Sequence, residues 1–131
     1  MGLRKTKSIR HNGKTVAEIL EAHARFFQGK DGGARADFTG ADLSRADLSG
    51  ANLSGAILRN ANLEGTDLRR SKLPGADLSG ANLRQADLTG ADLTGANLTD
   101  TDLEGAVLSD VRGLDRARDP AGARHRDRIV P

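Results

Sequence analysis

The feature that most constrains this chain is a five-residue period that runs without interruption through its middle. Fifteen repeats fill residues 36–110, and no residue is inserted or lost between them. The third position of each repeat is Leu, except for Phe38, and the first is Ala, Thr or Ser. The second position is Asp or Asn except at Ile57, Lys72 and Val107. A fixed period of this kind takes precedence over any local secondary-structure preference.

The period fits neither an α-helix nor an ordinary β-strand. Five residues advance by about 140° on a helix, so the leucines would be spread around it. In a strand, successive leucines would point to opposite faces. Gly, Ser and Asp favour disorder, but a disordered segment needs no constant Leu position. A coil of short extended segments, with one turn per repeat, places every Leu on a common axis, and Gly at most fifth positions suits turns that need a positive φ.

The composition requires a core without large rings. Cys, Trp and Tyr are absent, and the three Phe make the aromatic content only 2%. The third-position side chains are therefore the predicted structural core: Phe38, Leu43, Leu48, Leu53, Leu58, Leu63, Leu68, Leu73, Leu78, Leu83, Leu88, Leu93, Leu98, Leu103 and Leu108.

These repeats follow the pattern A-(D/N)-L-x-x across residues 36–110, and in this the chain resembles the pentapeptide repeat family. The resemblance implies an all-β solenoid, a right-handed quadrilateral (four-sided) parallel β-helix with four repeats per coil. Fifteen repeats would then form about 3.75 coils.

A solenoid exposes an apolar cross-section at each end, and native repeat proteins cover it with a cap. Thr15-Val16-Ala17-Glu18 has the form of a capping box, and Gly29 is a suitable stop signal. We therefore expect an N-terminal α-helical cap, packed on the first coil near Phe38. Its apolar face comprises Val16, Ile19, Leu20, His23 and Phe27.

The charges divide the chain into an acidic body with two basic ends. Residues 1–35 carry eight Lys and Arg against three acids, the repeats carry six against twelve, and the final segment carries six Arg against three Asp. The expected division is a basic flexible arm (1–14), a capping helix (15–29), a linker (30–35), the repeats (36–110), and a basic C-terminal cap with a mobile tail (111–131). The basic ends suit nucleic acid, an acidic partner or an anionic membrane, but solvated tails are the simpler expectation because no aromatic residue is interleaved for base stacking.

Nothing in the sequence indicates catalysis. Without Cys there is no thiolate chemistry, and the three histidines, His11, His23 and His125, all lie outside the repeats. The glycines follow the repeat period rather than a phosphate-binding motif. We therefore predict a protein that is not an enzyme and uses no metal or cofactor. The absence of a long apolar run or a signal-peptide pattern predicts a cytoplasmic location.

With four repeats per coil, as the resemblance implies, residues 20 apart stack in columns. One column contains Asp47, Asp67 and Asp87, and Arg69 and Arg70 on the same face could counter its charge. Ile57 departs from the consensus, because it places an apolar side chain at a position that is polar in most repeats. These six residues form the candidate partner-binding surface. The alternative, that Asp and Asn serve only the turns through side-chain hydrogen bonds to the backbone, stays open.

Two functions follow as hypotheses. The first is a scaffold for protein-protein interaction through flat polar faces of a rigid prism. The alternative is a DNA mimic, because some members of the family resemble B-DNA and occupy the DNA-binding site of type II topoisomerases, with gyrase inhibition or quinolone protection as the outcome. Acidic repeats favour this alternative, while central Leu rather than Phe, a short solenoid and interspersed arginines count against it. A strand edge at a solenoid end could also pair with a second copy as a homodimer.

Overall fold

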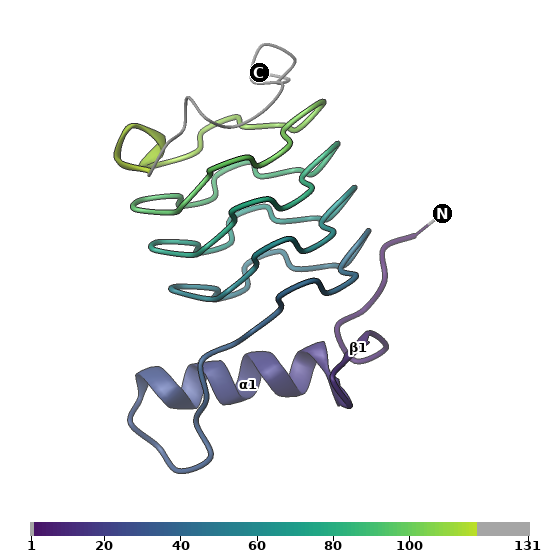
Figure 1. Cartoon of the computed structure of the whole chain (residues 1–131), viewed down its shortest axis with the longest axis vertical. Coiled ribbons are helices and arrows are strands. Elements are labelled where there is room, and N and C mark those ends of the chain that lie inside the picture. Colours follow the sequence, from purple (N-terminus) through teal and green to yellow (C-terminus); the bar gives the residue numbers. More distant parts are fainter. Residues whose placement is uncertain (1, 118–131) are drawn as a thin grey trace.

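A computed structural model describes residues 2–117 (Figure 1). In chain order it contains strands β1 (Arg10–His11) and β2 (Lys14–Thr15), helix α1 (Val16–Phe27), and a short 3-10 helix at Leu114–Arg116. Between α1 and the 3-10 helix the chain winds upward as stacked turns that are joined by isolated parallel bridges (Figure 1). The expected mobile tail after residue 117 lies outside the described residues.

The repeats form a β-helix solenoid in which residues 20 apart are neighbours. Asp42 pairs with Asn62, and Asn62 pairs with Asn82. The N–H of Leu43 donates to the C=O of Asn62 at 2.8 Å, and the N–H of Asn62 donates to the C=O of Ala41 at 2.8 Å. Four repeats therefore make one turn, and each turn hydrogen-bonds to the next, which stabilises extended segments too short to persist alone.

The ladder continues one repeat further than the periodic sequence. Asp92 pairs with Arg112, although residue 113 is Gly where the pattern would place Leu. The backbone can follow the turn below it without the central side chain, because the N–H of Arg112 donates to the C=O of Ala91 at 2.9 Å. The regular hydrogen bonds therefore extend past Asp110.

The interior is a column of third-position side chains flanked by small first-position residues. Fourteen of the fifteen third-position side chains are buried, whereas Leu108, at the upper end, is only partly buried. Thr66 and Thr101 replace first-position Ala, and their buried hydroxyls donate to the C=O of Leu43 and Leu78, both at 2.8 Å. The small first position thus admits a hydroxyl where a carbonyl can accept its hydrogen bond.

Every repeat ends in a left-handed turn. All fifteen fifth positions have positive φ, including the non-glycine residues Arg45 (54°), Arg70 (56°) and Gln85 (59°). A side chain there leans over the residue 20 positions later, which is Gly above each of them. A Cβ on Gly65, for example, would lie 3.2 Å from Cγ of Arg45. A bulky fifth position therefore favours Gly in the next coil, a rule that the repeat consensus does not reveal.

This rule predicts that Gly→Ala lowers the free energy of unfolding by different amounts at two positions of one column. Gly90→Ala places its Cβ 3.3 Å from Cγ of Arg70, whereas Gly50→Ala, at nearly the same φ (68° against 71°), meets nothing within 4 Å. Both variants bear the left-handed cost of about 1 kcal/mol, and we expect Gly90→Ala to lose additional stability. Urea unfolding measures the difference, and equal losses would contradict the rule. Arg70→Gly in the Gly90→Ala background should remove the excess.

The segment before α1 is ordered, which corrects the expectation of a flexible arm. Arg4 adds a parallel rung below Ala46, its N–H donating to the C=O of Arg45 at 2.7 Å. Asn12 and Gly13, both with positive φ, turn β1 into β2, and Ile9 is buried. The expectation was based on the basic charge of the segment, whereas the Asn-Gly turn, the buried Ile9 and the backbone bonds of Arg4 hold it on the repeats.

Helix α1 lies across the lower end of the solenoid (Figure 1). The predicted capping box is present: the N–H of Glu18 donates to Oγ1 of Thr15 at 3.1 Å, and the N–H of Thr15 donates to Oε1 of Glu18 at 2.9 Å. Val16 and His23 are buried, and Ile19 and Leu20 pack partly buried against the core. Phe27, expected on this face, is instead 54% exposed. His23 already fills the space against the first coil, so the Phe27 ring packs edge-on against the imidazole with centroids 4.9 Å apart.

Candidate interaction surface

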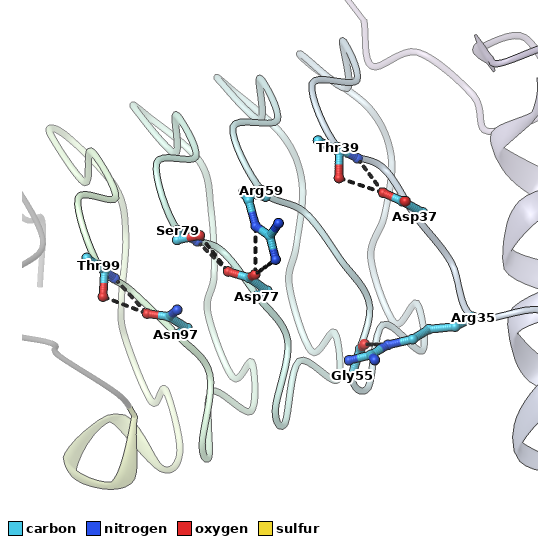
Figure 2. Close-up of polar contacts among 9 residues, drawn as sticks. All are labelled: Arg35, Asp37, Thr39, Gly55, Arg59, Asp77, Ser79, Asn97 and Thr99. Atoms are coloured by element: carbon cyan, nitrogen blue, oxygen red, sulfur yellow. Dashed lines mark hydrogen bonds and ion pairs between the residues drawn. The ribbon is translucent and has the colours of Figure 1, made fainter.

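The outer surface of the solenoid is built from one repeated side-chain lock. In each repeat with Asp or Asn at the second position, Oδ1 accepts the N–H of the residue two positions later. Asp37 accepts both the N–H and the hydroxyl of Thr39, at 3.0 and 2.6 Å, and Asn97 accepts those of Thr99 at 3.1 and 2.7 Å (Figure 2). Asp and Asn at second positions therefore stabilise the turns through local hydrogen bonds to the backbone. These bonds also fix each carboxylate or amide in one orientation on the face.

These local hydrogen bonds explain why several carboxyl groups have a lowered pKa. Hydrogen bonds from Thr39, Ser44 and Thr94 hold the pKa of Asp37, Asp42 and Asp92, respectively, below the ordinary value. Each charged carboxylate is stabilised because it accepts these hydrogen bonds more strongly than the protonated acid does.

At Asp77, burial acts to raise the pKa. Hydrogen bonds from Ser79 and Arg59 outweigh burial, and the pKa is lowered overall. Figure 2 shows Arg59 reaching the carboxylate of Asp77 from the preceding coil.

The column of Asp47, Asp67 and Asp87 is present, with consecutive members bridged in parallel. Its members differ in exposure, since Asp47 is exposed, Asp87 is half-buried and Asp67 is only 6% exposed. Arg69 donates from Nε and Nη2 to the two carboxylate oxygens of Asp67, at 2.9 and 2.8 Å. The central carboxylate is thus covered by its own arginine, and two less covered carboxylates flank the pair.

The other two candidate residues, Arg70 and Ile57, take no part in the ion pair of Arg69 and Asp67. Arg70 occupies the left-handed turn position, with φ of 56°. Ile57 is half-buried on a different face, where it bridges Asp37 and Asp77. The structure therefore places five of the six candidate residues on one face, defined here as the Asp47 face (Asp47, Asp67, Asp87, Arg69 and Arg70), and Ile57 on another.

We predict that Arg69→Leu raises the pKa of Asp67. Its hydrogen bonds from Arg69 are the main reason that this pKa is depressed, and without them burial would act on a carboxylate between two others. Titration of the carboxyl carbons by NMR measures the shift. Arg70→Leu removes a neighbouring charge but leaves the hydrogen bonds from Arg69 to Asp67 in place, so it should give a smaller rise. Equal rises in both variants would contradict this assignment.

The sequence analysis did not predict that two of the three fourth-position arginines join coils, whereas the third, Arg69, bonds Asp67 within its own repeat. Arg59 pairs with Asp77 at 2.7 Å, and Arg84 pairs with Asp102 at 3.2 Å, in each case 18 residues later. Arg84 also pairs with Glu104. An offset of 18 residues between a fourth-position arginine and a second-position acid is the signal that could have found these two pairs, although it would also have paired Arg69 with Asp87. These pairs intersperse positive charge among the acids of the repeats.

Residues 2–117 contain no group of three or more His, Cys, Asp or Glu side chains arranged to hold a metal ion. Nor does this part of the chain contain a helix long and apolar enough to cross a membrane.

Comparison with known proteins places these features in a family. A family model for pentapeptide repeats matches residues 36–73 and 71–110. The chain belongs to the pentapeptide repeat family. A crystal structure of a pentapeptide repeat protein (Rfr23) from the cyanobacterium Cyanothece 51142 is 41% identical, with a TM-score of 0.67, and the match covers 72% of this chain and 63% of that chain. This pentapeptide repeat protein thus spans less than two-thirds of the length of Rfr23.

More distant structures include alr5209, a pentapeptide repeat protein from Nostoc PCC 7120, with 31% identity, a TM-score of 0.38, and coverage of 88% of this chain and 96% of that chain. QnrB1, a plasmid-mediated fluoroquinolone resistance protein, has 17% identity and a TM-score of 0.27, and the match covers 64% of this chain and 65% of that chain. Neither likeness carries a functional inference. No curated protein sequence matches the chain significantly, and these matches indicate no enzyme family.

Proposed function

We propose that this pentapeptide repeat protein is a non-enzymatic scaffold that binds a protein partner through flat polar faces of a right-handed, four-sided solenoid. The observation that carries the proposal is the repeated lock, which holds polar side chains in columns 20 residues apart on a hydrogen-bonded backbone. Side chains ordered before binding lose little conformational entropy on association. In this proposal α1 acts as the cap of the lower end.

The Asp47 face is the proposed contact surface. Asp47 is exposed and Asp87 is half-buried. The two carboxylates flank the ion pair in which Arg69 neutralises Asp67. This arrangement suits a partner that presents two separated cationic groups, because a charged group meeting its opposite improves specificity and the rate of encounter. The ion pair between them would deter a partner with a continuous basic surface.

The test compares two double variants in quantitative affinity capture from the native cell. Asp47→Lys with Asp87→Lys reverses charge on the Asp47 face. Asp37→Lys with Asp92→Lys removes the same number of carboxylates and the same kind of lock from two other faces. We expect the first variant to lose a specific partner that the second retains. Loss of the same proteins from both variants, or from neither, would contradict the role of the Asp47 face.

The DNA-mimic alternative is favoured by one observation, the excess of twelve acids over six basic residues in the repeats. Arg59, Arg69 and Arg84 pair with several of those acids and so neutralise part of the acidic charge of the repeats. A gyrase supercoiling assay separates the two functions. Inhibition or quinolone protection at micromolar protein would favour the mimic, and the absence of both would remove it.

Self-association through the upper end is a further part of the proposal. On three sides of the last turn, the N–H groups of Leu98, Leu103 and Leu108 have no hydrogen-bond partner among residues 2–117. Such an edge can pair with the same edge of a second copy. Light scattering should then give twice the mass of 13.8 kDa, and a monomer at micromolar concentration would refute the dimer.

A further inference from the structure

The hydrogen bonds that join α1 to the repeats converge on one side chain. Within residues 2–117, both of these bonds run through His23, which is fully buried. The N–H of Ala36 donates to Nδ1 at 2.9 Å, and Nε2 lies 2.9 Å from the carbonyl oxygen of Ser54. Val16, Ile19 and Leu20 add apolar contacts but no directional bond. His23 is therefore the polar attachment between helix and solenoid.

The two partners determine the tautomer. A backbone N–H can only donate, so Nδ1 must be the unprotonated acceptor, and Nε2 carries the hydrogen that the Ser54 carbonyl accepts. Adding a proton at Nδ1 would point two donors at each other. It would also leave the Ala36 N–H buried without a partner, which opposes docking.

The surroundings of His23 also disfavour its charged form. Burial lowers the pKa of His23, the Ser54 carbonyl opposes this shift, and the positive charge of Arg35 adds to it. Arg35, on the linker, is the charged group that faces His23. The repeats present the Ser54 carbonyl and Ala36 N–H, and α1 presents the edge-on ring of Phe27. In the described chain no carboxylate contributes to this shift, so none is placed to compensate the charge of a protonated His23.

We propose that His23 is an acid-sensitive latch, whose protonation at Nδ1 releases α1 from the first coil and opens the lower end of the leucine column while the repeats remain folded. The surface exposed by this release includes Phe38, which is fully buried while α1 is docked. Docking is complete above about pH 6.5, the ordinary value for His, and weakens as the pH falls below it.

The repeats should outlast the helix because their hydrogen bonds do not involve α1. Their ladder joins coil to coil through backbone groups, as in the bond from the N–H of Leu63 to the C=O of Asn82. The repeat carboxyls with shifted pKa values, such as those of Asp37 and Asp92, titrate below their ordinary value, about 3.8, well below the range of His23. At a pH between the titration range of His23 and that of the repeat aspartates, α1 is released while the repeats stay folded.

The test uses a His11→Gln, His125→Gln variant of the full chain, which retains His23 as its single histidine. Nitrogen-detected NMR follows the ring, and hydrogen exchange follows the Ala36 amide, between pH 7.5 and 5.0. We expect the Nε2–H tautomer at high pH, and protection of Ala36 that falls with pH by up to tenfold per unit below the ordinary pKa. The Leu83 amide, which donates to the Asp102 carbonyl, should keep its protection throughout. Constant Ala36 protection, or parallel loss at Leu83, would overturn the proposal.

A second variant removes the titrating group itself. His23→Gln should show no pH dependence of α1 docking between pH 7.5 and 5.0, whatever its extent of docking. If the drop in Ala36 protection persists in this variant, another group is responsible and the latch assignment is wrong. The single-histidine protein decides the question even if His23→Gln fails to dock α1.

Discussion

Leu63→Ala is expected to lower the free energy of unfolding by about 3–5 kcal/mol, a large part of the roughly 5–15 kcal/mol that holds an ordinary domain together. Leu63 has no exposed surface and lies in an interior turn, with bonded turns below and above it. The surrounding leucines are held by the backbone ladder, so they cannot collapse into the space left behind. Chemical denaturation followed by far-UV circular dichroism measures the loss.

Leu108→Ala is the matched control. It deletes the same atoms at the same repeat position, but Leu108 is only partly buried at the upper end of the column. It should cost clearly less, because less apolar surface is lost and the cavity is open. Equal losses at the two positions would contradict a continuous leucine column with distinct ends.

Acid is expected to destabilise the repeats steeply below about pH 4. The pKa of each of five repeat aspartates is lowered in the folded chain, so their charged carboxylates stabilise the fold. This stabilisation is complete above the ordinary pKa, about 3.8, and is lost as the pH falls through the lowered values. These residues are Asp37, Asp42, Asp67, Asp77 and Asp92. Urea midpoints at pH 6 and pH 3 measure the effect.

The chain supplies its own control for the acid effect. Asn97 makes the same lock with Thr99 that Asp37 makes with Thr39, at nearly the same distances. An amide oxygen does not titrate, so Asp37→Asn with Asp92→Asn should keep the locks and lose less stability between pH 6 and pH 3. A loss as large as that of the unsubstituted protein would show that these carboxyls do not carry the acid sensitivity.

The sequence predicted the solenoid because one physical requirement, a Leu on the axis every five residues, leaves few backbone solutions. The role of Asp and Asn in the turns was also within reach, since a short polar side chain bonds its own backbone locally. Likewise the capping box of Thr15 and Glu18 depends only on a spacing of three residues. These features are local or strictly periodic, so they can be read without knowing which segments meet.

The features that sequence analysis missed depend on which segments meet. Arg4 becomes a rung only because the chain returns beneath Ala46, and Phe27 is exposed because His23 occupies the space beside Ser54. Composition suggested that Arg4 would be solvated and periodicity suggested that Phe27 would be buried, and tertiary contacts decided otherwise at both.

The account depends most directly on the 20-residue register, which NMR can measure in solution. Short proton distances should connect residues at second positions 20 apart, such as Asn62 with Asn82 and Asp47 with Asp67. The same spectra should lack contacts between residues 15 or 25 apart at these positions. Contacts at another offset, or none between distant repeats, would contradict the four-repeat turn and every surface assigned from it.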